Sequence, residues 1–175
     1  MLELGGAQGL TIDTATRLDR RRFAPLLAAG PGGLLDDAAR RITGAPFFTV
    51  PHLVREVRPA DDARAFAELV ALFRHERPDI VHTNSSKAGI LGRFAAAMAG
   101  VPIVVHTVHG WGFHPWQSRR EHALYVGLER AAARLTTQLV AVSEANARAG
   151  AREEIAPFEA FAIIRPGVHL SLIHI

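Results

Sequence analysis

The stretch RPDIVHTNSSKAGILGRFAAAMAGVPIVVHT (77–107) decides the fold class of this chain. DIVHT (79–83) is a short run rich in β-branched residues, which is typical of a strand. A helix is predicted from the serines that follow to about Ala99, because Gly100 can take the left-handed conformation that ends a helix. VPIVVHT (101–107) is then a second strand. Strand, helix and strand in this order are typical of a parallel β-α-β unit.

The same alternation continues on both sides of this unit. Further strands are predicted at 23–29, 46–50, 138–142 and 161–165, and further helices at 7–19, 34–43, 61–76, 119–135 and after Ser143. Six strands separated by helices predict an α/β fold with a parallel sheet. In such sheets ligands bind beyond the carboxyl ends of the strands. The periodicity of the helix at 119–135 places the side chains of Leu124, Tyr125, Leu128, Ala132 and Leu135 inward.

Both ends of the sequence are unusual. The glycine pair Gly5-Gly6 is typical of a loop after a first strand, but only Met1–Leu4 precede it. The first strand of a doubly wound sheet is usually central. We therefore expect it to be largely missing, which leaves a gap in the sheet, or else very short. LSLIHI (170–175) matches, when back-translated, a transposon end used in sequencing libraries, so we expect an artefact there and a chain truncated at both ends.

Composition excludes several classes of function. The chain has no cysteine, which rules out disulfides, thiolate catalysis and Cys-ligated zinc. The net charge is only +3, and no nucleic-acid-binding motif is present, so we expect no nucleic-acid partner. No apolar run is long enough to span a membrane and no signal peptide is evident, which predicts a cytoplasmic protein. Arg20, Arg21 and Arg22 indicate either a solvated helix end or a peripheral contact with anionic lipid at the inner face of the membrane.

Several segments in this order resemble the N-terminal domain of family 4 glycosyltransferases. They are GGAQ (5–8), PGGLLDDA (31–38), RPDIVHTNSSKAGILGRFAA (77–96), GVPIVVHTVHGWGFH (100–114), VSEAN (142–146) and IRPGVHL (164–170). The resemblance covers almost the whole chain. The HT.SSKAG.LGR and T.HG..FH pair is most similar to bacterial enzymes that build cell-surface polysaccharides.

The resemblance implies the N-terminal half of a GT-B fold, a Rossmann-like sheet with helices on both faces. Residues 1–169 would form the acceptor-side domain, and we expect the donor-binding C-terminal domain to be absent from these 175 residues. The implied reaction moves a sugar from a nucleotide-sugar donor to a carbohydrate or lipid-linked acceptor, with retention and without a metal or other cofactor. The 175 residues alone are then expected to be inactive. A non-catalytic sugar- or nucleotide-binding module and a GT-B sugar-nucleotide epimerase are the alternatives.

HTVHGWGFHPW (106–116) gathers three histidines, which could indicate a metal site. His106 and His109 lie on a strand-loop junction, where strand alternation and the turn point them differently, so no metal site is expected. By resemblance His109 is the family's histidine that points into the sugar site. There an imidazole can hydrogen-bond a sugar hydroxyl and stabilise an oxocarbenium-like transition state. His106 is expected either to pack within the strand or to support a site residue from behind.

The remaining candidates lie in loops at the same sheet edge. By resemblance Gly5 and Gly6 approach the donor phosphates, where backbone N–H groups at a helix N-terminus stabilise developing charge. Ser86 is either a helix N-cap or a ligand contact, and Lys87, the only lysine, is either structural or a contact to an acidic ligand. The candidate acceptor cleft also includes Gly110, Trp111, Phe113 and His114. The alternative role of the aromatic residues is a small local core under the loop, and that of His114 is to close the loop.

Overall fold

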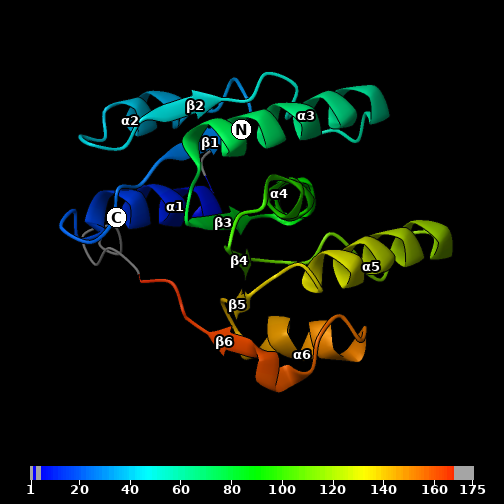
Figure 1. The fold of residues 1–175 in the computed structure, drawn as a ribbon. Helices are drawn as coiled ribbons and strands as arrows, with labels where there is room; N and C mark the ends of the chain where they lie inside the picture. Colours follow the sequence, from blue (N-terminus) through cyan, green and yellow to red (C-terminus); the bar gives the residue numbers. More distant parts are fainter. Residues whose placement is uncertain (1, 3–4, 168–175) are drawn as a thin grey trace.

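The computed structural model describes residues 2 and 5–167 of the chain. Within these residues the strands form two parallel sheets (Figure 1). The first sheet pairs β1 with β2 and the second has the order β3-β4-β5-β6. The strands are β1 (Leu27–Ala29), β2 (Phe47–Thr49), β3 (Ile80–Asn84), β4 (Ile103–Val108), β5 (Gln138–Ala141) and β6 (Phe161–Ile163).

Helices lie on both sides of the strands, with α1 on one side and α4, α5 and α6 on the other (Figure 1). The helices are α1 (Gly6–Arg17), α2 (Asp36–Arg40), α3 (Pro59–Glu76), α4 (Ser86–Ala99), α5 (Arg119–Ala133) and α6 (Glu144–Arg152), with a short 3-10 helix at Phe158–Ala160. The predicted Rossmann-like α/β fold is therefore confirmed. The β3-α4-β4 unit has the expected order, and Gly100 ends α4 in the left-handed region with φ 75°.

No hydrogen-bonded pairing joins β1 to β3 among the residues that the structure describes. Residues 1, 3 and 4, where a short first strand was considered, lie outside the described residues, as does the tail at 170–175. Whether the first strand is missing or very short therefore stays a prediction. Leu2 is buried with Ala15 of α1 and with Leu27 and Ala29 of β1, so α1 packs onto the first sheet.

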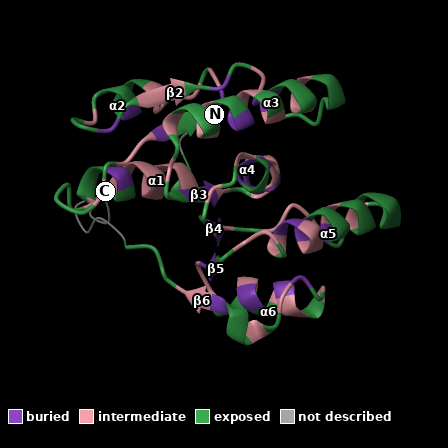
Figure 2. Ribbon diagram, viewed as in Figure 1, coloured by how far each residue is buried: buried purple, intermediate pink, exposed green. Residues whose placement is uncertain are grey.

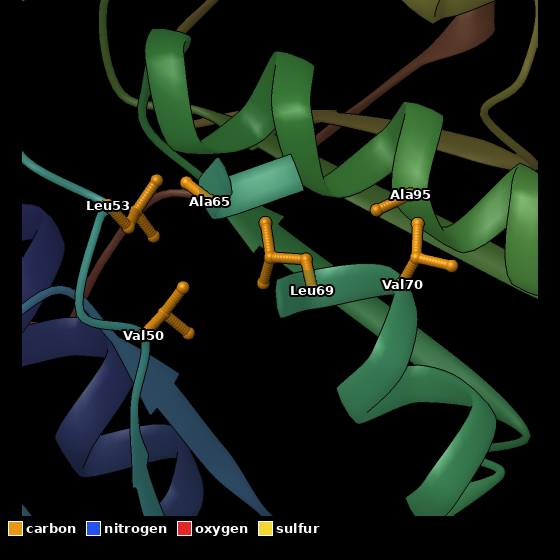
Figure 3. Packing of buried hydrophobic residues seen from close by; sticks show 6 residues of the cluster. All are labelled: Val50, Leu53, Ala65, Leu69, Val70 and Ala95. Atoms are coloured by element: carbon orange, nitrogen blue, oxygen red, sulfur yellow. The ribbon is translucent and has the colours of Figure 1, made fainter. Parts of the chain in front are cut away.

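Four small apolar clusters hold these layers together. The largest cluster joins α3 to α4 and to the loop after β2, and consists of Val50, Leu53, Ala65, Leu69, Val70 and Ala95 (Figure 3). Val81 and Val104 pack against Ala96 between the second sheet and α4. On the same sheet, Val108 and Leu139 pack with Phe161 near α6. Buried residues are thus concentrated along the strands and the helix faces that cover them (Figure 2).

The inward face predicted for α5 was correct at Ala132, which is buried, but wrong at Leu124 and Leu128. The side chains of Leu124 and Leu128 are exposed, and the buried residues of this helix are Val126, Glu129 and Ala132. The reason is that the helix turns a charged group, Glu129, toward α4, where an arginine balances it. The exposed leucines therefore leave an apolar stripe on the outer face.

No helix among residues 2 and 5–167 is long and apolar enough to cross a membrane.

Candidate functional site

The candidate site is built where β3 and β4 end beside each other. Asn84 is the last residue of β3 and pairs in register with Thr107 of β4. His109 follows β4 directly, so parallel pairing brings both side chains to one edge of the sheet. The His109 Nε2 atom lies 2.9 Å from the Asn84 Oδ1 atom, a hydrogen bond between residues that are far apart in sequence.

His109 is half-buried, and this burial lowers the pKa of its imidazole because removal from water disfavours the charged form. A neutral imidazole carries one N–H donor and one acceptor nitrogen. Because Asn84 Oδ1 can only accept, Nε2 is the donor and Nδ1 is the acceptor. The expected site histidine is therefore a neutral hydrogen-bond acceptor near pH 7.

Helix α6 holds the backbone of the same histidine. Asn146 Nδ2 donates to the carbonyl oxygen of His109 at 3.4 Å. Trp111 Nε1 in turn donates to the carbonyl oxygen of Asn146 at 2.9 Å. The Ser143 hydroxyl accepts from the Asn146 amide at 3.2 Å, which confirms Ser143 as the N-cap of α6. His109 is therefore held by two elements: Asn84 of strand β3 contacts its ring, and Asn146 of helix α6 contacts its backbone carbonyl.

Trp111 and Phe113 pack within the loop and against its neighbours. Their rings stack with centroids 5.3 Å apart, and Trp111 meets Phe161 of β6 edge-on at 6.3 Å. A Cβ atom at Gly150 would lie 2.6 Å from the Trp111 ring, so glycine is required for this approach. These contacts show the small local core that was the alternative role. An acceptor contact for either ring stays a prediction.

Ser86 lies against the loop that carries His109. A Cβ atom at Gly112 would lie 3.0 Å from Ser86 Cβ and 3.0 Å from Tyr125 of α5, so the loop is wedged between α4 and α5. Ser86 is the first residue of α4 and not its N-cap, because that position belongs to Ser85. Ser85 has φ 61° and ψ 160°, a strained conformation for a residue with a side chain.

Two further loop residues face outward. Gly110 has open space around its Cα, and His114 is exposed with its ring 6.0 Å from that of Trp116. Gln117 fixes the loop by accepting from the His114 amide at 3.0 Å and donating to the Gly112 carbonyl at 2.9 Å. His114 and Gly110 thus remain accessible beside the site, where a ligand contact stays a prediction.

Lys87 is engaged by the protein itself. Its ammonium lies 2.5 Å from Asp62 of α3, donates to the carbonyl of Val54 at 2.9 Å and also contacts the carbonyl of Glu56. These acceptors tie the start of α4 to α3 and to the loop before it. Lys87 therefore has the structural role that was one of its two predicted roles. A contact with a ligand would require Lys87 to leave these partners.

Gly5 and Gly6 form the start of α1. Gly5 is the N-cap with φ −158° and ψ 158°, an extended conformation that any residue can adopt. A Cβ atom at Gly5 would lie 2.6 Å from Gln8 Oε1, the far end of a flexible side chain, and one at Gly6 would meet nothing within 4 Å. A tight turn therefore does not require glycine at either position, and the first turn of α1 has no acidic side chain to compete for its N–H groups.

His82 and His106 lie behind the site. His82 Nε2 contacts the Thr107 hydroxyl at 2.7 Å, and His106 Nδ1 contacts the Thr83 hydroxyl at 2.9 Å. Burial lowers the pKa of both rings, and the nearby charge that His109 would carry adds to this effect. Among the described residues no group of three or more potential ligands is placed to hold a metal ion.

Sequence reasoning missed the polar partners of these residues. Asn84 and Asn146 position His109, and the only signal was that Asn84 directly follows a predicted strand. Arg93 of α4 and Glu129 of α5 form a buried ion pair, with Nη2 and Oε2 atoms 2.5 Å apart and side chains 0% and 1% exposed. Arg93 Nε also donates to the carbonyl of Gly89 at 2.9 Å. The pair fixes α5 against α4.

Comparison with known proteins gives consistent matches. Residues 4–172 match the sequence profile described as Glycosyltransferase Family 4. The UDP-Gal:alpha-D-GlcNAc-diphosphoundecaprenol alpha-1,3-galactosyltransferase of Escherichia coli is 39% identical over 141 residues, or 78% of this chain and 35% of the relative. The capsular polysaccharide biosynthesis glycosyltransferase CapM of Staphylococcus aureus is 30% identical over 90 residues, or 51% of this chain and 23% of the relative.

Solved structures share the fold. The Anabaena protein Alr3699/HepE, crystallised with UDP and glucose, superposes with a TM-score of 0.72 at 21% identity, covering 98% of this chain and 44% of that one. Acinetobacter baumannii MurG superposes with a TM-score of 0.64 at 12% identity, covering 95% and 43%. The chain therefore spans about a third or less of the two sequence relatives and less than half of each structure.

Proposed function

Because the chain belongs to glycosyltransferase family 4, we propose that it is the acceptor-side domain of a retaining hexosyltransferase. The complete enzyme transfers a sugar from a nucleotide-sugar to a hydroxyl of a lipid-linked carbohydrate during cell-surface polysaccharide synthesis. Support for this substrate class comes from the E. coli relative, whose name specifies UDP-Gal and an undecaprenol-linked acceptor. The name of CapM, capsular polysaccharide biosynthesis, points to the same class of pathway.

The observation that carries the proposal is the neutral, doubly held His109 at the carboxyl edge of the sheet. Departure of the nucleoside diphosphate develops positive charge on the transferred sugar. An imidazole nitrogen that accepts a hydrogen bond from a sugar hydroxyl increases electron density next to that charge and stabilises it. Because burial lowers the pKa of His109, the ring keeps this acceptor nitrogen at neutral pH.

The start of α1 fits the role proposed for Gly5 and Gly6. Free backbone N–H groups and the helix dipole favour negative charge at a helix N-terminus. The open space at Gly6 allows a phosphate to approach the backbone closely, and neither glycine is needed for the turn itself. We assign this end of α1 to the departing diphosphate.

The outer face of α5 fits a lipid-linked acceptor. On α5, Arg120, Leu124 and Leu128 follow each other at four-residue spacing, and Leu124 is 61% exposed; Trp116, in the turn before the helix, is 88% exposed. An apolar stripe with an adjoining arginine can rest on an anionic membrane surface. We expect Leu124→Glu to weaken co-sedimentation of the 175-residue chain with vesicles rich in phosphatidylglycerol. Equal sedimentation of this variant and the parent would contradict a membrane contact through α5.

A chimera tests the proposed activity. This chain replaces the aligned segment of the E. coli galactosyltransferase, and transfer of labelled galactose from UDP-galactose to a GlcNAc-diphospho-lipid is measured. We expect transfer with an α-linked product. The unmodified E. coli enzyme is the positive control, and the 175-residue chain alone is expected to transfer nothing. A folded chimera without activity, or transfer by the 175-residue chain, would contradict the proposal.

A further inference from the structure

We propose that Asn84 is a positioning residue that holds the His109 ring with Nε2 as the donor, so that Nδ1 accepts a hydrogen bond from a hydroxyl of the sugar substrate. The inference rests on the proposed function for the identity of the ligand. Its structural part, the orientation and protonation of the ring, stands on the contacts of this chain alone.

The geometry at Asn84 supports a fixed side chain. Asn84 ends β3 and is paired with Thr107, and its backbone carbonyl accepts from the Ser85 hydroxyl at 2.6 Å. The next residue, Ser85, is held at φ 61°, in a conformation that glycine usually occupies. Such a conformation persists when the surrounding structure determines the backbone. The turn therefore fixes the direction in which the Asn84 amide points.

The backbone contact from α6 supports the same conclusion. Asn146 holds the His109 carbonyl while Asn84 holds the ring, so two asparagines from different elements define the residue. With Nε2 engaged, Nδ1 is the only acceptor that a neutral ring can offer a ligand. The titratable neighbours are His82 of β3 and His106 of β4, whose pKa values are lowered mainly by burial. Near neutral pH these neighbours therefore add little charge.

The test reads the ring directly by NMR of the ¹⁵N-labelled 175-residue chain. Long-range correlations between ring protons and nitrogens identify which nitrogen of His109 carries the proton, and a His109→Gln spectrum assigns the signals. We expect protonation at Nε2. A proton on Nδ1 of the parent chain would overturn the inference.

A second experiment changes the hydrogen-bond partner of His109. Asn84→Asp keeps an acceptor oxygen but adds a negative charge, which favours the imidazolium. We expect the His109 titration, and the acid limb of the chimera's pH–rate profile, to move up by about one pH unit or more. Thr107→Val is the matched control, since it removes the hydroxyl beside His82 at the paired strand position and leaves the His109 contact intact. An unshifted His109 titration in Asn84→Asp would overturn the inference.

The two proposals can fail separately. An inactive chimera together with Nε2 protonation and a shifted Asn84→Asp titration would overturn the transferase proposal and leave the positioning role of Asn84 standing. An active chimera with unshifted titration would overturn the positioning role alone.

Discussion

Replacing Arg93 with methionine removes the cation that Glu129 faces inside the contact between α4 and α5. Both side chains are almost completely buried, and burial raises the pKa of Glu129 although Arg93 opposes this shift. Removing one partner of a buried pair typically costs about 3–5 kcal/mol, because the other charge is left uncompensated. This is a large part of the roughly 5–15 kcal/mol that stabilises a typical domain.

The same reasoning predicts a pH dependence and a rescue. In Arg93→Met the carboxyl of Glu129 has a folded pKa above its unfolded value, so the folded state gains stability as pH falls through the folded pKa. The deficit should therefore be smaller at pH 5 than at pH 8. The double variant Arg93→Met/Glu129→Leu should recover most of the loss, because an apolar pair of similar volume carries no charge. Urea unfolding followed by circular dichroism measures both effects. A single variant that loses less than about 1 kcal/mol, or a double variant no more stable than the single, would refute the argument.

Three further predictions concern the same chain. The free energy of unfolding should fall as the pH drops below 6.5, because burial lowers the pKa of His106 and the unfolded state therefore binds a proton that the folded state does not. In urea titrations, His106→Asn should reduce this slope by about 1.4 kcal/mol per pH unit. Gly89→Ala should destabilise the folded chain by about 1–3 kcal/mol, because the added Cβ would lie 2.5 Å from the His106 ring. In the same assay, Gly127→Ala on α5 should stabilise the folded chain by about 0.5–1 kcal/mol, because its Cβ would meet nothing within 4 Å. Ser85→Gly should raise the thermal midpoint by relieving φ 61°, and an unchanged or lower midpoint would show that the turn is not strained.

Local sequence signals were sufficient for the strands, the order of elements and the position of His109. The glycine that ends α4 and the serine that caps α6 act within one helical turn, so their effect is visible in a short window. Parallel pairing then requires that the residues after β3 and β4 meet at one edge. The location of the candidate site therefore follows from the same pattern that predicted the fold.

Contacts between distant segments could not be read in this way. The apolar periodicity of α5 predicted that Leu124 points inward. In the structure Glu129 is buried instead, because it pairs with Arg93 of another helix, and Leu124 is exposed. Lys87 stood out as a lone lysine, yet its partner Asp62 comes from the preceding helix. The contact of Asn84 with His109 depends on the loop that follows the next strand. In each case the contact depends on which other helix or strand packs against the residue. The periodicity of a single segment does not contain this information.

The turnover of the chimera with and without His109 tests the central claim most directly. We expect His109→Ala to lower kcat for galactose transfer by about 10²-fold or more, since a well-placed acid–base or hydrogen-bonding side chain typically contributes 10²–10⁴-fold. His75→Ala, an exposed histidine on α3, is the matched control and should retain the parent value. A His109→Ala chimera that turns over as fast as the parent would contradict the assignment of this histidine to the reaction.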